Sequence, residues 1–120
     1  MNDYVKCSGK INYIPQTNLF ITDQFGVCDT NQLQCYGIRH VFNVSPVQLK
    51  QYPGINYYNI PISDDSQQNI LQFFDRVFAK IDEIGSQGQY VVINCQAGVS
   101  RSASFVIGYL IKRGLSYENK

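Results

Sequence analysis

The sequence lacks several residue types and patterns, and each shortage argues against a class of protein. It has one histidine among its 120 residues and no Cys-x-x-Cys pair, so the usual ligands of a structural zinc site are missing. Ten Lys and Arg against nine Asp and Glu leave a net charge of +1. A chain with no basic excess is a poor candidate for binding nucleic acid or an anionic membrane surface.

Long hydrophobic runs are also missing. The longest apolar stretch, residues 105–111, is far shorter than the roughly 20 residues of a membrane-spanning helix. Residues 1–6 carry charges of both signs and no apolar segment, so no secretory signal is visible. We therefore expect a cytoplasmic protein, with the nucleus as the alternative compartment, whose four cysteines are reduced thiols.

The remaining composition fits one folded domain over residues 1–120. Apolar residues make up 44% of the chain and include nine Tyr and seven Phe, which is enough to bury a core. Strands are predicted at residues 18–22, 38–44, 57–60 and 90–93, and helices at 31–36, 70–84 and 102–112. This alternation predicts an α/β fold with a central, mostly parallel sheet and flanking helices.

The loop after the last predicted strand has the composition of a phosphate-binding site: residues 94–102 read NCQAGVSRS. Strand-to-helix loops of this kind are where α/β proteins bind ligands and where helix-start N–H groups surround anions. Cys95 and Arg101 are six residues apart, so one phosphate could have the thiol beneath its phosphorus while the guanidinium holds two oxygens. Gly98 permits successive N–H groups to point inward. The N–H dipoles, the start of the helix and the Arg101 guanidinium together form a positive field, which favours the thiolate form of Cys95.

The alternative is that Cys95 is a buried structural residue at a strand end, as free cysteines commonly are. In that case Arg101 would have no evident purpose. The glycine, the Ser-Arg-Ser exit and the apolar helix that follows all favour the phosphate loop.

This loop resembles the signature loop of the cysteine-dependent protein phosphatases, specifically the dual-specificity branch, whose usual form is His-Cys-x-x-Gly-x-x-Arg-Ser. The resemblance extends upstream through residues 19–21, 37–44 and 60–64 and covers about residues 10–115. It implies a protein tyrosine phosphatase-like fold. It also implies hydrolysis of phosphotyrosine, phosphoserine and phosphothreonine in proteins through a phosphocysteine intermediate, with no metal and no other cofactor.

The resemblance assigns a role to each matching position. Cys95 is the nucleophile, and Ser102 stabilises the thiolate as it leaves in the second step. The general acid is Asp64 by its position before the aromatic helix, with Asp65 as the alternative; either aspartate could instead only cap that helix. The phosphate-binding residues are Gln96, Ala97, Gly98, Val99, Ser100 and Arg101.

Two departures from the family pattern modify these expectations. Asn94 replaces the family histidine; it can support the loop by a hydrogen bond but carries no positive charge, so we expect a slower enzyme at neutral pH. The family continues through further helices beyond the position of Ser116, whereas this chain ends at Lys120. We therefore expect a C-terminally short domain with exposed apolar sheet surface, through which copies of the chain could associate.

The loop also bears on the substrate. None of its variable positions, residues 96, 97, 99 and 100, is basic, which disfavours phosphoinositides and favours a phosphoprotein. The low charge disfavours RNA 5′-ends, and no carbohydrate-binding stretch is evident. A catalytically weak or inactive pseudophosphatase that binds phosphoproteins is the alternative, motivated by Asn94 and the short C-terminus.

Overall fold

The computed structural model describes residues 10–60, 71–95 and 100–114. The helices and strands follow the order that the sequence predicts, with one extra strand and one extra 3-10 helix, Gly26–Cys28. The strands are β1 (Asn12–Tyr13), β2 (Leu19–Asp23), β3 (Ile38–Asn43), β4 (Asn56–Asn59) and β5 (Tyr90–Cys95). The helices are α1 (Thr30–Cys35), α2 (Leu71–Ser86) and α3 (Ser100–Lys112).

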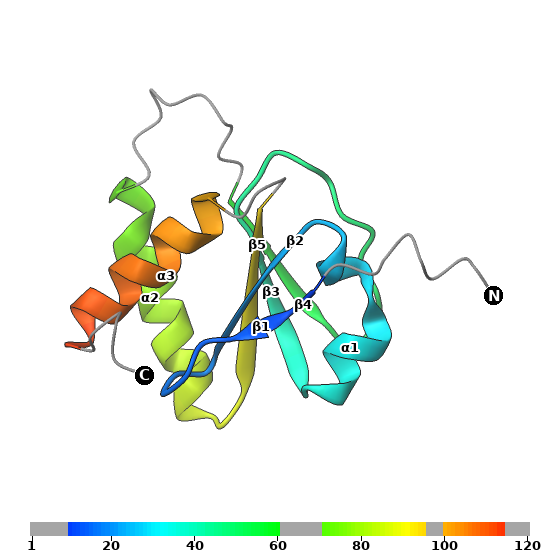
Figure 1. Cartoon of the computed structure of the whole chain (residues 1–120), viewed down its shortest axis with the longest axis horizontal. Helices are drawn as coiled ribbons and strands as arrows, with labels where there is room; N and C mark the ends of the chain where they lie inside the picture. Colours follow the sequence, from blue (N-terminus) through cyan, green and yellow to red (C-terminus); the bar gives the residue numbers. More distant parts are fainter. Residues whose placement is uncertain (1–9, 61–70, 96–99, 115–120) are drawn as a thin grey trace.

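The five strands form one sheet in the order β1-β2-β5-β3-β4 (Figure 1). The four strands from β2 to β4 in this order are parallel, and β1 pairs antiparallel with β2. The predicted fold class, an α/β fold with a mostly parallel sheet, is therefore confirmed. Because β3, β4 and β5 run in the same direction, their carboxyl ends lie at one edge of the sheet.

Helices cover both faces of this sheet. Figure 1 shows α2 and α3 side by side on one face and α1 on the other. The larger apolar core lies beneath α2 and α3, and a second core lies beneath α1. β5 is central, and its residues from Val91 to Cys95 are all buried, which explains its continuous apolar character.

Helix α1 is delimited by a polar cap at one end and a glycine at the other. The Asp29 carboxylate accepts a hydrogen bond from the Gln32 backbone N–H at 3.2 Å, which satisfies a donor of the first turn. Gly37 has φ +72°, a left-handed conformation that side chains disfavour, and it turns the chain directly into β3.

The contact between α2 and α3 depends on a second glycine. A Cβ atom at Gly108 would lie 2.7 Å from Phe74 Cε2 and 3.2 Å from Phe78 Cζ. The rings of Phe74 and Phe105 lie 5.0 Å apart between centroids, so aromatic side chains fill the space beside the glycine. This close packing holds α3 against α2.

Most of the apolar side chains at the centre of the sheet are buried. The apolar side chains of β3 are buried, as are those of β5 from Val91 onward. Among the described residues, Ile111 of α3 is the most exposed large hydrophobic residue, at 68%. Among the described residues of β3 and β5, the expected exposed apolar surface is limited to Tyr90 at the start of β5, which is 39% exposed. Within the described ranges, no helix has the length and apolar character needed to cross a membrane.

Candidate active site

Cys95 is the last residue of β5, at the carboxyl edge of the sheet. Its neighbour on one side is β2, where Asp23 is its register partner, and on the other side is β3. The thiol is free and buried, at 2% exposure, among the apolar residues beneath α2 and α3. The strand β5 therefore ends with a cysteine whose sulfur atom lies near the start of the next helix, α3.

Ser102 reaches that sulfur from the first turn of α3. Its hydroxyl Oγ donates a hydrogen bond to Cys95 Sγ at 3.1 Å, and the serine side chain has no exposed surface. A hydroxyl held this close can donate to a thiolate, and a hydrogen bond to a charged acceptor is stronger than one to a neutral thiol. The structure thus brings together two of the predicted site residues.

Arg101 precedes Ser102 in the same turn and is half-buried. No acidic residue occupies the first turn of α3, so the partial positive charge of the helix amino terminus is not offset there. A guanidinium group and a helix amino terminus at the end of a parallel strand form an environment that suits a phosphate dianion.

Asn94 precedes Cys95 in β5, and its side chain lies on the other face of the sheet. Adjacent strand residues point to opposite faces, so the Asn94 side chain lies on the α1 side while the Cys95 thiol lies on the α3 side. Its Nδ2 donates to Asn43 Oδ1 of β3 at 3.1 Å. This bond ties the end of β5 to the end of β3, while the loop that Asn94 is predicted to support lies outside the described residues.

Asn43 is the centre of this network and was not singled out by the sequence. Its Nδ2 donates to the Val47 carbonyl at 2.7 Å and to Asn59 Oδ1 at 3.3 Å, while its Oδ1 also accepts from Ser45 Oγ at 2.7 Å. Because a carbonyl only accepts, the bond to Val47 fixes the orientation of the Asn43 amide. The sequence feature that could have indicated Asn43 is its position as a polar residue at the end of an apolar strand.

The same geometry leaves one oxygen of Asn94 without a partner. Its Nδ2 must face Asn43 Oδ1, so its Oδ1 faces away and makes no hydrogen bond within the described residues. The side chain has no exposed surface. A buried acceptor without a donor costs about 1–3 kcal/mol.

Several predicted site residues lie outside the described ranges. They are the two candidate acids, Asp64 and Asp65, and the loop residues Gln96, Ala97, Gly98 and Val99. Ser100 begins α3, but its side chain is likewise outside the description. The described part of the predicted site is therefore Asn94, Cys95, Arg101 and Ser102.

The cysteines differ in redox state. Cys35 and Cys95 are free, whereas Cys28 is disulfide-bonded. The expectation of four reduced thiols is therefore wrong for Cys28. Among the described side chains, no three His, Cys, Asp or Glu residues come together as a potential metal site.

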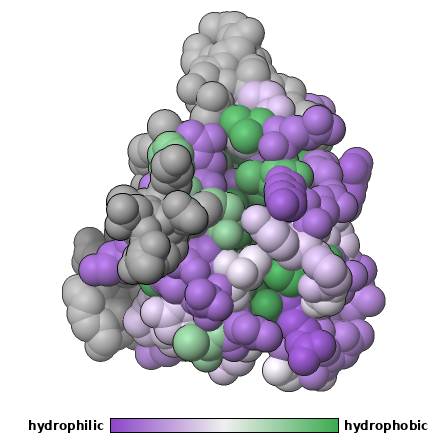
Figure 2. All heavy atoms as spheres, turned by 90° about the vertical axis from the view of Figure 1, so that its right-hand side faces the viewer, coloured by the Kyte–Doolittle hydropathy of each residue, from purple (hydrophilic) through white to green (hydrophobic). Residues whose placement is uncertain are grey.

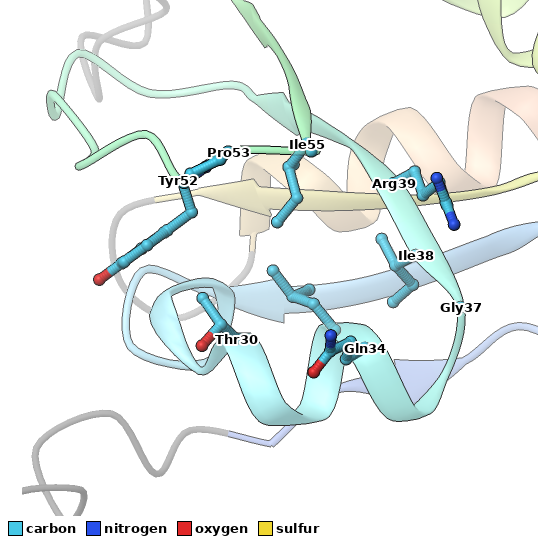
Figure 3. A pocket seen from close by; sticks show the side chains of 10 residues that line it. Thr30, Gln34, Gly37, Ile38, Arg39, Tyr52, Pro53 and Ile55 are labelled. Carbon is cyan, nitrogen blue, oxygen red and sulfur yellow. The ribbon is translucent and has the colours of Figure 1, made fainter.

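A separate hollow of about 430 Å³ lies on the face that carries α1. On that side of the molecule hydrophobic residues form a strip bordered by hydrophilic ones (Figure 2). Figure 3 shows Ile55 directed toward α1, where Thr30 and Gln34 lie. The hollow is bounded by the amino-terminal ends of β3 and β4, whereas Cys95 lies at the carboxyl edge of the parallel sheet. It is therefore distinct from the candidate active site.

Comparison with known proteins identifies the family of this chain. The family profile described as "Dual specificity phosphatase, catalytic domain" matches residues 19–118. The chain is 33% identical over 96 residues to protein phosphatase Slingshot of Drosophila melanogaster, a match that covers 79% of this chain and 9% of that protein. It is 32% identical over 112 residues to human dual specificity protein phosphatase 9, a match that covers 91% of this chain and 29% of that protein. The chain thus spans less than a third of either relative.

Solved structures show the same arrangement. The crystal structure of human DUSP28 has a TM-score of 0.80 and 28% identity, covering 89% of this chain and 72% of that one. A human tyrosine phosphatase-like serine/threonine/tyrosine-interacting protein has a TM-score of 0.76 and 26% identity, with 89% and 76% coverage. From its sequence, its fold and its cysteine-to-helix geometry, this chain belongs to the dual specificity phosphatase family.

Proposed function

We propose that the chain is a metal-independent protein phosphatase that hydrolyses phosphotyrosine, phosphoserine and phosphothreonine through a phosphocysteine at Cys95. The observation that supports this most directly is the 3.1 Å hydrogen bond from Ser102 Oγ to Cys95 Sγ at the junction of β5 and α3. A buried thiol that accepts a hydrogen bond from a hydroxyl at a helix amino terminus is suited to repeated formation and release of a thiolate.

In the first step the Cys95 thiolate attacks phosphorus. The S–P bond forms as the P–O bond to the substrate breaks, and Asp64 donates a proton to the departing oxygen. Arg101 and the backbone N–H groups of residues 96–101 hold the three remaining phosphoryl oxygens. The leaving group is then a neutral hydroxyl.

In the second step a water molecule attacks the phosphocysteine and passes a proton to Asp64. The S–P bond breaks, inorganic phosphate leaves, and the sulfur carries the negative charge again. The Ser102 hydroxyl donates a hydrogen bond to that sulfur as the charge develops and keeps its proton, which lowers the barrier of this step specifically.

A phosphoprotein-binding pseudophosphatase is the second candidate. Two observations favour it. Asn94, which replaces the family histidine, leaves its Oδ1 unpartnered among the described residues, and one structural relative is a tyrosine phosphatase-like serine/threonine/tyrosine-interacting protein. This candidate requires phosphate binding by Arg101 without turnover.

Hydrolysis of para-nitrophenyl phosphate in the presence of a chelator separates the two candidates. An enzyme turns the substrate over, loses activity with Cys95→Ser, and slows with Asp64→Asn more than with Asp65→Asn. The reverse order of the two aspartate variants would assign the acid to Asp65. No turnover combined with binding of a phosphopeptide to the native chain, abolished by Arg101→Ala, would support the pseudophosphatase.

A further inference from the structure

We propose that the free edge of β4, together with the groove between β4 and α2, binds an extended peptide segment that carries acidic side chains. This docking site goes beyond the proposed catalytic activity and does not depend on it. Three features of the described residues support it: an unpaired strand edge, an apolar groove beside that edge, and a cation on the groove that has no partner.

The first feature is the backbone of β4. This strand is at the end of the sheet order and pairs only with β3 among the described strands. The Ile60 N–H donates to the Asn43 carbonyl of β3, so alternation along the strand directs the amide groups of Tyr57 and Asn59 away from β3. Two donors and two acceptors are thus presented at the edge, which is the requirement for strand addition.

The second feature is a groove of about 470 Å³ along the α2 face of this edge. Its floor is formed by Phe42 and Val77, which are buried, and the Tyr58 ring stacks on Phe42 at 4.7 Å. Ile60 and Ala79 complete the apolar lining. A strand added to β4 would direct every second side chain into this groove, so an aliphatic side chain at one of those positions would be buried.

The third feature is the charge along the groove. Arg76 is exposed and makes no ion pair or hydrogen bond within the described residues. One turn later in α2, Lys80 lies 5.5 Å from the centroid of the Tyr58 ring and 3.4 Å from Glu83 Oε1. Among the described residues that line the groove, the one unpaired charge is therefore positive, and it favours a carboxylate on the bound segment.

These features specify the partner. It is an extended protein segment. The side chains on one of its faces are acidic and aliphatic in turn, and the side chains on its other face can be of any type. A suitable probe is the end-blocked peptide Thr-Glu-Thr-Ile-Thr-Glu-Thr, because in a strand the Glu and Ile side chains share one face. A matched peptide with Lys in place of both Glu residues tests the charge.

The native full-length chain, labelled with ¹⁵N, is titrated with the acidic peptide. We expect the amide signals of Tyr57 and Asn59 to shift and their hydrogen exchange to slow. Arg76→Glu should weaken binding about three- to tenfold, whereas Arg39→Glu, the same charge change at an exposed arginine outside the groove, should leave it within about twofold. The Lys peptide should bind the native chain weakly. Its affinity should be no higher than that of the acidic peptide for the Arg76→Glu variant.

Two N-methylated forms of the acidic peptide test the strand geometry. In one form every second backbone amide is methylated, starting from the first residue. In the other form the methyl groups are on the intervening amides, starting from the second residue. Only the amides that face β4 bond to it, so one form should lose about tenfold or more in affinity and the other should bind nearly as well as the parent. Equal affinities of the two forms would overturn the proposal. So would peptide-induced shifts confined to other residues, equal effects of the two arginine variants, or a dimer of the chain that buries β4 and excludes the peptide.

Discussion

The Ser102 hydroxyl lies 3.1 Å from the Cys95 sulfur, and both side chains are buried at the point where β5 meets α3. Because this hydroxyl donates to sulfur, its value to catalysis is greatest when the sulfur is negatively charged. In the proposed cycle the thiolate is regenerated when phosphocysteine is hydrolysed. The hydrogen bond therefore bears chiefly on the second chemical step.

Replacing Ser102 with Ala should slow breakdown of the phosphocysteine more than its formation. Loss of a hydrogen bond to a charged group costs about 1.5–3 kcal/mol, so kcat should fall roughly tenfold to a hundredfold. Rapid-quench kinetics should then show a burst of para-nitrophenol followed by slow turnover. Ser86→Ala, at the end of α2, is the matched control and should leave both steps unchanged. Equal slowing of burst and turnover would argue against a role specific to the second step.

The two asparagines behind the site should differ in their contribution to stability. Asn43→Ala removes the acceptor of Ser45 and Asn94 and the donor to Val47, so it leaves several buried groups unpaired. We expect a loss of about 2–4 kcal/mol. Asn94→Ala breaks one of those bonds but also removes its own unpartnered oxygen, so a loss of about 1 kcal/mol is expected. Urea unfolding measures both, and a larger loss for Asn94→Ala would contradict the network.

The packing of α2 on α3 should not tolerate a side chain at residue 108. Gly108→Ala would place a Cβ atom 2.7 Å from Phe74 Cε2, which forces the ring or the helix to move. Overpacking of this kind costs about 1–3 kcal/mol. Phe74→Leu should recover part of that loss when combined with Gly108→Ala. A double-mutant cycle from thermal or urea unfolding measures this coupling, and additive losses would show that the two residues do not compete for the same space.

Tyr109 should make stability fall at alkaline pH. Burial, and then the hydrogen bond to the Asp82 carboxylate, raise the pKa of Tyr109 above its usual value of about 10. The unfolded chain therefore loses this proton at lower pH than the folded one. The associated stability is complete below pH 10 and is lost as pH rises through the folded-state value. Unfolding free energies measured from pH 8 to 11 should fall less steeply for Tyr109→Phe, and parallel curves would contradict the assignment.

Much of the fold was predictable because its signals are local. Alternating apolar runs and helical spacing located β2 to β5 and all three helices, since each buries enough side chains to leave a pattern. The strand β1 was missed because both of its two residues are exposed and its pairing depends on β2. The disulfide state of Cys28 was also missed, because redox pairing depends on proximity in the folded chain.

The candidate site was predictable where it follows from one continuous motif. Cys95, Arg101 and Ser102 lie within a short segment: the spacing of Cys95 and Arg101 predicted a phosphate site, and the family resemblance added Ser102. Asn43 lies 51 residues from Asn94, and only the adjacency of β3 and β5 brings the two amides together. No local pattern predicts such a cross-strand contact. A buried asparagine at the end of an apolar strand gives only the hint that a polar partner exists.

Direct detection of the covalent intermediate tests the central claim. The Ser102→Ala chain is mixed with excess para-nitrophenyl phosphate, quenched within one turnover, digested and examined by mass spectrometry. The proposed mechanism predicts the added mass of one phosphoryl group on the peptide that contains Cys95, and none in the Cys95→Ser variant. Turnover without that adduct, or an adduct on another residue, would contradict phosphocysteine catalysis at Cys95.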